Sequence, residues 1–368
     1  MAAKKFCETC SKSLIDEVRR LGAEKQNGVS LKYMMEFGSR PTERNFLISA
    51  QFLHKELPVR IARRAIELEN LPYGLSEKPA VLKVRDWYLE SFRDLRTFPD
   101  VKDKNDECEF TRTIQRIKVR HNHVVPMMRM GIQQLKESLD PKIDYEGLDE
   151  IQQFLDRFYL SRIGIRMLIE QHVALHRKNP PNIVGCIDTK LSPMKVAQAA
   201  SEEARGICMR HYGSAPDVTF EGDPNFTFPY VESHLKLMVF ELVKNSLRAV
   251  HERFMNSDKV SPPIEITVAG GSEDVTIRVS DKGGGIPRSG LPRIFTYLYS
   301  TAENPPTEEI DFNTTNKVPL AGYGFGLPIS RVYARYFGGD LQIYSMEGHG
   351  TDAIIQLSRL GDSQEPLP

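Results

Sequence analysis

Residues 241–249 read Glu-Leu-Val-Lys-Asn-Ser-Leu-Arg-Ala and lie in an amphipathic run from about Ser233 to Phe254. Charged and polar residues recur there every three or four positions, so a helix would align them on one face: Glu241, Lys244, Asn245 and Arg248. The opposite face is apolar at the same spacing, which predicts a helix. Taken alone, such a charged column is more often a solvated helix face than a site.

Three further motifs follow this predicted helix in order. Asp281-Lys-Gly-Gly-Gly285 comes after a strand-like run, Gly322-Tyr-Gly-Phe-Gly326 opens a second helix, and Gly348-His-Gly-Thr351 joins two strands. Each motif alone is weak evidence, but their order is restrictive. Together with the helix they resemble the nucleotide site of the GHKL superfamily, which includes gyrase, Hsp90, bacterial histidine kinases and MutL.

The helix motif carries residue types that suit phosphoryl transfer. ATP chemistry requires neutralised phosphates and a positioned metal ion. The amide oxygen of Asn245 is a hard ligand of the kind that Mg²⁺ prefers. Glu241 lies one turn earlier on the same face, so it can act as a base toward an attacking hydroxyl or water. Lys244 and Arg248 would bring positive charge near the phosphates.

The glycine motifs are expected to shape the nucleotide pocket. Asp281, at the end of a strand, can accept a hydrogen bond from the adenine amino group, and Thr351 would close the adenine pocket. Gly283 and Gly285 allow the backbone to pass close to the base. The N-terminus of a helix favours phosphate oxygens, so a further set is predicted to bind ATP there: Gly322, Tyr323, Gly324, Phe325, Gly326 and Leu327.

Residues Thr296–Leu320 have no apolar periodicity and are rich in Thr, Pro and Asn. A loop of that length in a compact domain is usually a lid or a disordered segment. We expect it to be the ATP lid, with Ser300 and Thr301 as phosphate or metal contacts. The alternative for Asp281–Gly285 is an ordinary turn after a strand, and the alternative for Thr351 is a plain strand threonine.

The 368 residues are predicted to form two domains, 1–178 and 179–368. The first half has helical periodicity, with expected helices at Glu43–Leu53, Val59–Leu68, Ala80–Phe98, Glu109–Leu139 and Asp144–His176. Arg177-Lys-Asn-Pro-Pro-Asn182 interrupts that pattern, and alternating strands in hairpins follow. The predicted fold is an all-α N-terminal helical bundle followed by an α+β ATP-binding sandwich of the GHKL (Bergerat) type.

Composition narrows the possible partners. The 49 basic and 49 acidic residues balance, so nothing indicates binding to nucleic acid. No apolar run approaches the roughly 18 residues of a membrane span. Five cysteines at irregular positions favour a reducing compartment. Cys7-Glu-Thr-Cys10 has metal or redox spacing, but no second pair follows, so we interpret it as two terminal thiols.

Longer stretches resemble the mitochondrial dehydrogenase kinases. They are Phe154–His172, Lys55–Arg60, Arg120–Pro126 and Pro319–Arg331, and the similarity runs from about Leu31 to Leu357. Within that family the sequence is most similar to pyruvate dehydrogenase kinases. Branched-chain 2-oxoacid dehydrogenase kinases are the alternative, because Ala174–His176, Leu191–Lys195 and His211–Pro216 look more like theirs.

The resemblance implies Mg·ATP-dependent phosphorylation of a serine on the dehydrogenase E1α subunit, which inactivates the complex. It also implies a homodimer formed through the sheet domain, docking on the lipoyl domain of the dihydrolipoyl acetyltransferase (E2), and a mitochondrial matrix location. Glu241 would be the base, Asn245 the Mg²⁺ ligand and Asp281 the adenine contact. The family's inhibitory oxoacid pocket matches Tyr88, Ser91, His121, Ser161, Arg162 and Arg166.

The sequence departs from the animal members in several places. Leu237 stands where many of them have a histidine one turn before the base, so the tuning of Glu241 is left open. The sequence ends at Gln364-Glu-Pro-Leu-Pro368 without their Asp-Trp tail, as expected of a plant-like form. Acidic residues near the N-terminus do not suit a transit peptide: Glu8, Asp16 and Glu17.

Two other functions remain open at this stage. His121 precedes Pro126 at the spacing of a phospho-accepting histidine, although Asn122 replaces the usual acidic neighbour. A lone helix histidine is more often structural. An ATP-gated clamp like Hsp90 or MutL would need a transducer domain after the nucleotide domain, whereas only a short segment follows the last expected strand.

Overall fold

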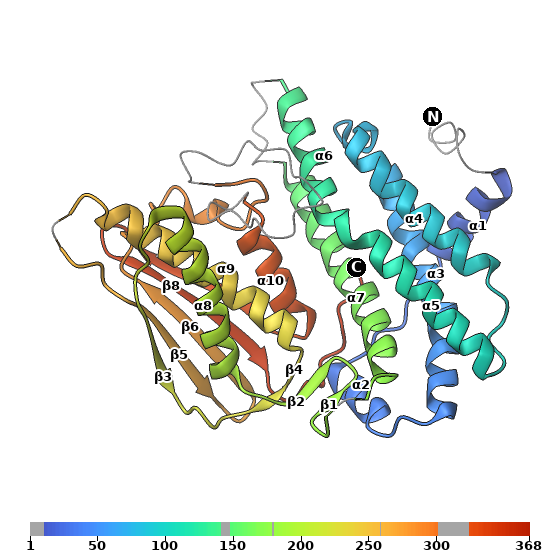
Figure 1. The fold of residues 1–368 in the computed structure, drawn as a ribbon. Coiled ribbons are helices and arrows are strands. Elements are labelled where there is room, and N and C mark those ends of the chain that lie inside the picture. Colours follow the sequence, from blue (N-terminus) through green and yellow to red (C-terminus); the bar gives the residue numbers. More distant parts are fainter. Residues whose placement is uncertain (1–10, 141–147, 179, 258, 301–323) are drawn as a thin grey trace.

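The computed structural model describes residues 11–140, 148–178, 180–257, 259–300 and 324–368. Figure 1 shows a group of long helices beside a sheet that helices cover. The arrangement confirms the predicted fold class. None of the helices in these ranges has the length and apolar character that crossing a bilayer requires.

The helices and short loops of the first half contain no strand among the residues that the structure describes. Its α-helices are α1 (Lys12–Gly22), α2 (Leu31–Gly38), α3 (Glu43–Glu69), α4 (Pro79–Thr97), α5 (Lys104–Arg120), α6 (Val124–Ser138) and α7 (Asp149–Leu175). Two short 3-10 helices, labelled η, lie between them: η2 (Leu75–Glu77) and η3 (His121–His123). Helix α7 is buried on more than one side, as its dense apolar pattern predicts. It lies between the other helices and the sheet half (Figure 1).

Two of the expected helix boundaries in this half are wrong. Pro58 lies in the middle of α3 instead of starting a second helix. An internal proline costs about 3 kcal/mol, but Leu57, Pro58 and Val59 are all buried, so packing holds the helix together. The expected single helix Glu109–Leu139 is instead two helices separated by η3. There Pro126 would clash with the carbonyl of Asn122 in a continuous helix.

The second half contains two sheets. The larger has the spatial order β3 (Val218–Gly222), β5 (Ile264–Gly270), β6 (Asp274–Asp281), β8 (Gly350–Ser358) and β7 (Asp340–Met346). β3 and β5 are parallel, and the other neighbours are antiparallel. The smaller sheet joins β1 (Ile183–Val184), β2 (Ile187–Leu191) and β4 (Phe228–Tyr230). The pairs β5–β6 and β7–β8 are hairpins, which confirms the hairpins expected in this half.

Three helices cover one face of the larger sheet (Figure 1): α8 (Pro193–Tyr212), α9 (Glu232–Phe254) and α10 (Gly326–Tyr336). A short η5 (Leu291–Arg293) precedes the lid segment. The hydroxyl of Ser192 accepts a hydrogen bond from the Lys195 N–H and so caps α8. Side chains alternate along a strand, which places Asp281 on the same buried face of β6 as Val279.

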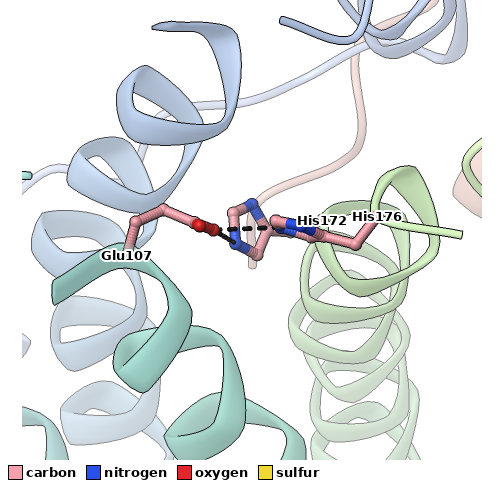
Figure 2. Close-up of side chains that lie close together, drawn as sticks. All are labelled: Glu107, His172 and His176. Atoms are coloured by element: carbon pink, nitrogen blue, oxygen red, sulfur yellow. Dashed lines mark ion pairs between the residues drawn. The ribbon is translucent and has the colours of Figure 1, made fainter. Parts of the chain in front are cut away.

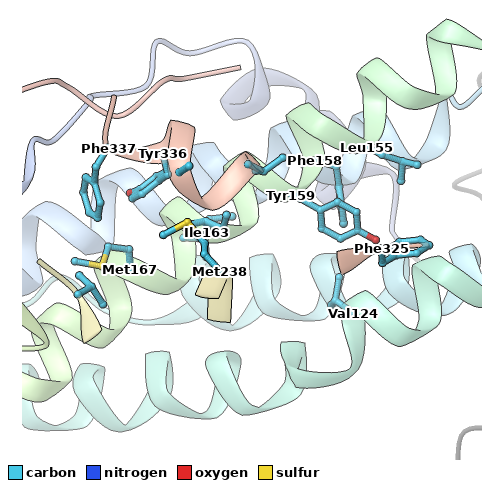
Figure 3. Packing of buried hydrophobic residues seen from close by; sticks show 14 of the residues in the cluster. Val124, Leu155, Phe158, Tyr159, Ile163, Met167, Met238, Phe325, Tyr336 and Phe337 are labelled. Atoms are coloured by element: carbon cyan, nitrogen blue, oxygen red, sulfur yellow. The ribbon is translucent and has the colours of Figure 1, made fainter. Parts of the chain in front are cut away.

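A single apolar core joins the two halves. Figure 3 shows Tyr159 and Ile163 of α7 near Phe325 and Tyr336, at the two ends of α10. The predicted domain boundary at residue 178 falls between α7 and β1. After β8, however, the chain returns to the helical half, where Glu365 contacts Arg60 of α3.

Candidate active site

A cavity of about 330 Å³ opens between α9, the loop after β6 and the start of α10. Its volume lies in the range of small-molecule sites. Many predicted ATP-site residues line it: Glu241, Asn245, Arg248, Asp281, Gly283, Gly285, Ser300, Gly324, Gly326, Leu327 and Thr351. Thr301, Gly322 and Tyr323 lie outside the described residues. The fold thus brings together motifs that are more than 100 residues apart.

Asp281 is held at the buried end of the cavity. Its Oδ1 accepts a hydrogen bond of 2.8 Å from the Gly283 N–H, and its Oδ2 accepts one of 2.9 Å from the Ser246 hydroxyl. Burial raises the pKa of this carboxyl above its ordinary value, and hydrogen bonds from Gly283, Ser246 and the Thr351 N–H oppose that rise. Ser246 was not expected from the sequence, where its only signal is a hydroxyl on the apolar side of the helix.

The two glycines after Asp281 are required by the protein's own packing. A Cβ on Gly283 would lie 2.5 Å from Cβ of Ala249, and one on Gly285 would lie 2.1 Å from the Met346 carbonyl oxygen. Gly285 also has a φ of 73°, which disfavours other residues. These glycines bring the loop against α9 and the β7–β8 turn, and so define the floor of the cavity.

Glu241 and Lys244 form an ion pair on α9. Nζ of Lys244 lies 2.9 Å from Oε2 of Glu241. The Glu241 side chain lines the cavity, whereas Lys244 is buried and is not among the lining residues. Direct contact of Lys244 with phosphates therefore remains a prediction, and its visible contact is with the carboxylate.

Asn245 and Arg248 face the cavity from the next turn of α9. The amide oxygen of Asn245 and the carboxylate of Glu241 are hard oxygen donors, which fit Mg²⁺. Arg248 lies near Glu252, with 3.6 Å between Nε and Oε1. This side of the cavity therefore offers both a metal ligand and a positive charge.

The start of α10 forms the third wall of the cavity. Gly324 has a φ of 74°, and its carbonyl accepts a hydrogen bond from the Leu298 N–H. Phe325, predicted to bind ATP, packs instead against Tyr159 and Tyr297 and does not line the cavity. Gly324 and Gly326 therefore line the cavity on either side of Phe325, while the Phe325 ring packs α10 against α7.

Comparisons with known proteins agree with this geometry. Residues 28–188 match the family described as mitochondrial branched-chain alpha-ketoacid dehydrogenase kinase. Residues 230–360 match the histidine kinase-, DNA gyrase B-, and HSP90-like ATPases. A mitochondrial [pyruvate dehydrogenase (acetyl-transferring)] kinase of Arabidopsis thaliana is 70% identical over 370 residues, covering 100% of both chains. Isozyme 1 of that kinase from Rattus norvegicus and from Homo sapiens is 42% identical, covering 92% of this chain and 79% of theirs.

The chain belongs to the pyruvate dehydrogenase kinase family. This confirms the family expected from the sequence, and the relatives together with the GHKL ATPase match identify the chain as an ATP-dependent kinase. The roles of individual site residues remain predictions, and the cavity shows which of these residues lie together.

One cavity residue of this kinase that the sequence analysis missed is Arg253. Its guanidinium donates hydrogen bonds to the carbonyls of Lys282, Gly348 and His349, at 2.6–2.8 Å. It thereby fixes the glycine loop after β6 against the β7–β8 turn, the two segments that carry Asp281 and Thr351. A basic residue near the C-terminal end of a helix is too common a pattern to signal this role.

The kinase also gathers the residues of the predicted oxoacid pocket in its helical half. Oγ of Ser91 lies 3.0 Å from Nε2 of His121, and the Tyr88 and His121 rings are 4.5 Å apart. Arg162 donates to the His121 carbonyl at 3.0 Å. Burial lowers the pKa of His121 to about 3, so this imidazole is neutral and enclosed. Ser161 is buried on α7 next to Arg162, and Arg166 donates a hydrogen bond of 3.1 Å to the Lys118 carbonyl.

Charge in this helical cluster is unbalanced. Within the described ranges, no ion pair joins Arg162 or Arg166 to a carboxylate, and the buried Tyr88 hydroxyl has no hydrogen-bond partner. Burial and the neighbouring Arg162 lower the pKa of Arg166 to about 10. The hydrogen bonds of these two arginines go to the carbonyls of His121 and Lys118 and to Oδ1 of Asn122.

Proposed function

We propose that this kinase transfers the γ-phosphate of Mg·ATP to a serine of the E1α subunit of the pyruvate dehydrogenase complex, in the mitochondrial matrix, and so inactivates the complex. The observation that carries the proposal is the position of Glu241, in one cavity with Asn245 and the start of α10. The printed names of full-length relatives support the choice of substrate.

Each wall of the cavity has a role in this reaction. Asp281 accepts a hydrogen bond from the adenine amino group, and the first N–H groups of α10 bind phosphate oxygens. Asn245 would hold Mg²⁺, which neutralises phosphate charge when it is bound. Glu241 accepts the proton of the serine hydroxyl as phosphate is transferred. Lys244 holds the carboxylate in place, and Arg248 supplies positive charge at the phosphates.

The homodimer and the docking on the E2 lipoyl domain belong to the same proposal. The edge strand β7 exposes two apolar side chains, Tyr344 at 58% and Met346 at 64%. Exposed apolar groups on a strand edge favour pairing with another chain, which supports a dimer through the sheet. Light scattering of the Tyr344→Lys variant tests this, because a monomer is expected if the edge forms the interface.

Arg162 and Arg166, which form no ion pair with a carboxylate among the described residues, support an inhibitory site for a 2-oxoacid. A small carboxylate can bind both guanidinium groups. The Arg162→Met variant should keep basal phosphate transfer and lose inhibition by pyruvate. Unchanged inhibition in that variant would reject the pocket.

The experiment for the main proposal is transfer of labelled γ-phosphate to purified pyruvate dehydrogenase E1 and, in parallel, to branched-chain 2-oxoacid dehydrogenase E1. Acid-stable serine phosphate on the pyruvate enzyme supports the proposal. Label on the branched-chain enzyme alone would favour the alternative substrate. Acid-labile label on this chain would indicate a histidine kinase, which the enclosed His121 argues against.

A further inference from the structure

A second cluster of metal-ligating side chains lies outside the nucleotide cavity. Figure 2 shows Glu107 of α5 pointing at His172 and His176, which lie one turn apart at the end of α7. One carboxylate oxygen, Oε1 of Glu107, lies 3.2 Å from Nε2 of His172 and 3.0 Å from Nε2 of His176. Neither the phosphate transfer nor the oxoacid pocket uses these residues.

The distances suit a tetrahedral metal ion. Zinc binds imidazole nitrogen and carboxylate oxygen at about 2.0–2.2 Å, which places neighbouring ligand atoms roughly 3.3–3.5 Å apart. The two contacts to Glu107 are within a few tenths of an ångström of that separation, and the ligand atoms of the three residues all lie within 4.8 Å of one another. Two histidines spaced i, i+4 on one helix face are a recurrent zinc pattern.

The surroundings orient the rings for metal binding. Oγ of Ser49 lies 2.8 Å from Nδ1 of His172. A proton on Nδ1, donated to that oxygen, leaves a lone pair on Nε2, and a metal ion there would replace the 2.8 Å contact between Nε2 and the Thr111 hydroxyl. Metal-binding histidines usually donate their other N–H in this way. The His176 ring stacks on Phe46, with 4.3 Å between the ring centroids, so both imidazoles are held in place.

The burial of the cluster also suits a site with one open position. Glu107 and His172 are 4% and 1% exposed, and His176 is 27% exposed. A metal ion would therefore have protein ligands on its inner side and water on its outer side. Two imidazoles and a single carboxylate select zinc over Mg²⁺, because Mg²⁺ prefers oxygen ligands and keeps its waters.

We propose that Glu107, His172 and His176 bind one Zn²⁺ ion, which fastens α5 to the end of α7. The competing explanation is a hydrogen-bonded network in which both Nε2 atoms carry protons toward Glu107. In that arrangement the Thr111 hydroxyl, 2.9 Å from the same Oε1, is a third donor to one oxygen. A measurement of zinc binding distinguishes the metal site from this hydrogen-bonded network.

The test is zinc binding to the untagged full-length chain without nucleotide, measured by metal content after dialysis and by competition with a chromophoric chelator. The wild type should bind one zinc that His176→Gln and Glu107→Gln lose, with affinity reduced at least about 100-fold, and Ser49→Ala should lose about tenfold. His211→Gln, an exposed histidine near the end of α8, is the matched control and should bind as the wild type does.

The Cys7→Ser/Cys10→Ser double variant separates this site from the terminal thiols and should retain the zinc. Zinc should also raise the Tm of the wild type and of the double variant, but not that of His176→Gln. His176 is partly exposed, so its variant is expected to fold, and circular dichroism checks this. The proposal is overturned if the wild type retains no zinc, or if His176→Gln and Ser49→Ala bind it as tightly as the wild type.

Discussion

Lys244 binds both carboxylate oxygens of Glu241, with Nζ 3.0 Å from Oε1 and 2.9 Å from Oε2. The pair is enclosed on the Lys244 side and open to the cavity on the Glu241 side. The charge of Lys244 therefore acts on the expected base, and through it on the substrate hydroxyl.

Replacing Lys244 with methionine should lower kcat at least about tenfold and leave the KM for ATP nearly unchanged, because the base loses its orientation while the nucleotide contacts remain. Steady-state kinetics with pyruvate dehydrogenase E1 measures both. Lys236→Met is the control, since Lys236 lies on the same helix and forms only an exposed pair with Glu203. A raised KM with unchanged kcat would instead place Lys244 at the phosphates.

Ser246→Ala should weaken ATP binding. It removes the hydroxyl that donates to Oδ2 of Asp281 and leaves a buried carboxylate oxygen without that partner. The expected cost is about 1–3 kcal/mol of binding free energy, measured by calorimetry with ATP. In the control Ser201→Ala the lost hydroxyl bonds only the Ala197 carbonyl of its own helix, so affinity should not change.

The same variant should shift the pH dependence of ATP binding. The adenine contact needs ionised Asp281, so affinity is present above the pKa of that carboxyl and is lost as the pH falls through it. Burial raises that pKa, and the Ser246 hydrogen bond lowers it. Affinity should therefore begin to fall at a higher pH in Ser246→Ala than in the wild type. Superimposable pH profiles would show that Asp281 does not control binding.

Gly326→Ala should yield a folded but nearly inactive kinase. The added Cβ would lie 2.3 Å from Oε2 of Glu241. Because that atom ends a flexible side chain, the fold can adjust while the base is displaced. A displacement of about 1 Å costs roughly 100-fold in rate. The control is Gly206→Ala on α8, whose Cβ meets only Arg210, at 3.6 Å. Wild-type transfer by Gly326→Ala would argue against Glu241 as the base.

Glu365→Gln should destabilise the contact between the two halves. Arg60 donates to Glu365 at 2.6 Å, and Tyr336 of α10 donates to the same carboxylate at 2.7 Å. Breaking a buried ion pair costs about 3 kcal/mol or more, which chemical denaturation measures. Asp362→Asn, three residues earlier and exposed, should have no effect. Equal stability of the two variants would contradict a structural role for the buried pair.

Much of the site could be predicted from sequence because its motifs are local. Strand alternation places Asp281 on the inner face of β6, and the i, i+3 and i+4 spacing aligns Glu241 with Asn245 on α9. Each of these two placements follows from the residue repeat of a single strand or helix. The glycines after Asp281 also follow from the need for close approach, although their neighbours are Ala249 and Met346 and not only the ligand.

The missed residues act across long distances in the chain. Ser246 meets Asp281, Arg253 meets the β7–β8 turn, and Glu365 meets Arg60, which is 305 residues away. Contacts between residues so far apart in the chain leave no periodic pattern in the sequence. The helix boundaries at Pro58 and Pro126 were wrong for opposite reasons. Packing keeps α3 continuous through Pro58, whereas Pro126 interrupts the single helix that was expected across it.

The most direct test of the account is the Glu241→Gln variant, measured for Mg·ATP affinity by calorimetry and for single-turnover phosphate transfer to pyruvate dehydrogenase E1. Glutamine keeps the shape of the side chain and cannot accept the serine proton. Affinity should stay close to that of the wild type and transfer should be at least about 100-fold slower, with Glu232→Gln on the same helix unaffected. Transfer by Glu241→Gln at the wild-type rate would contradict the central claim that Glu241 is the base.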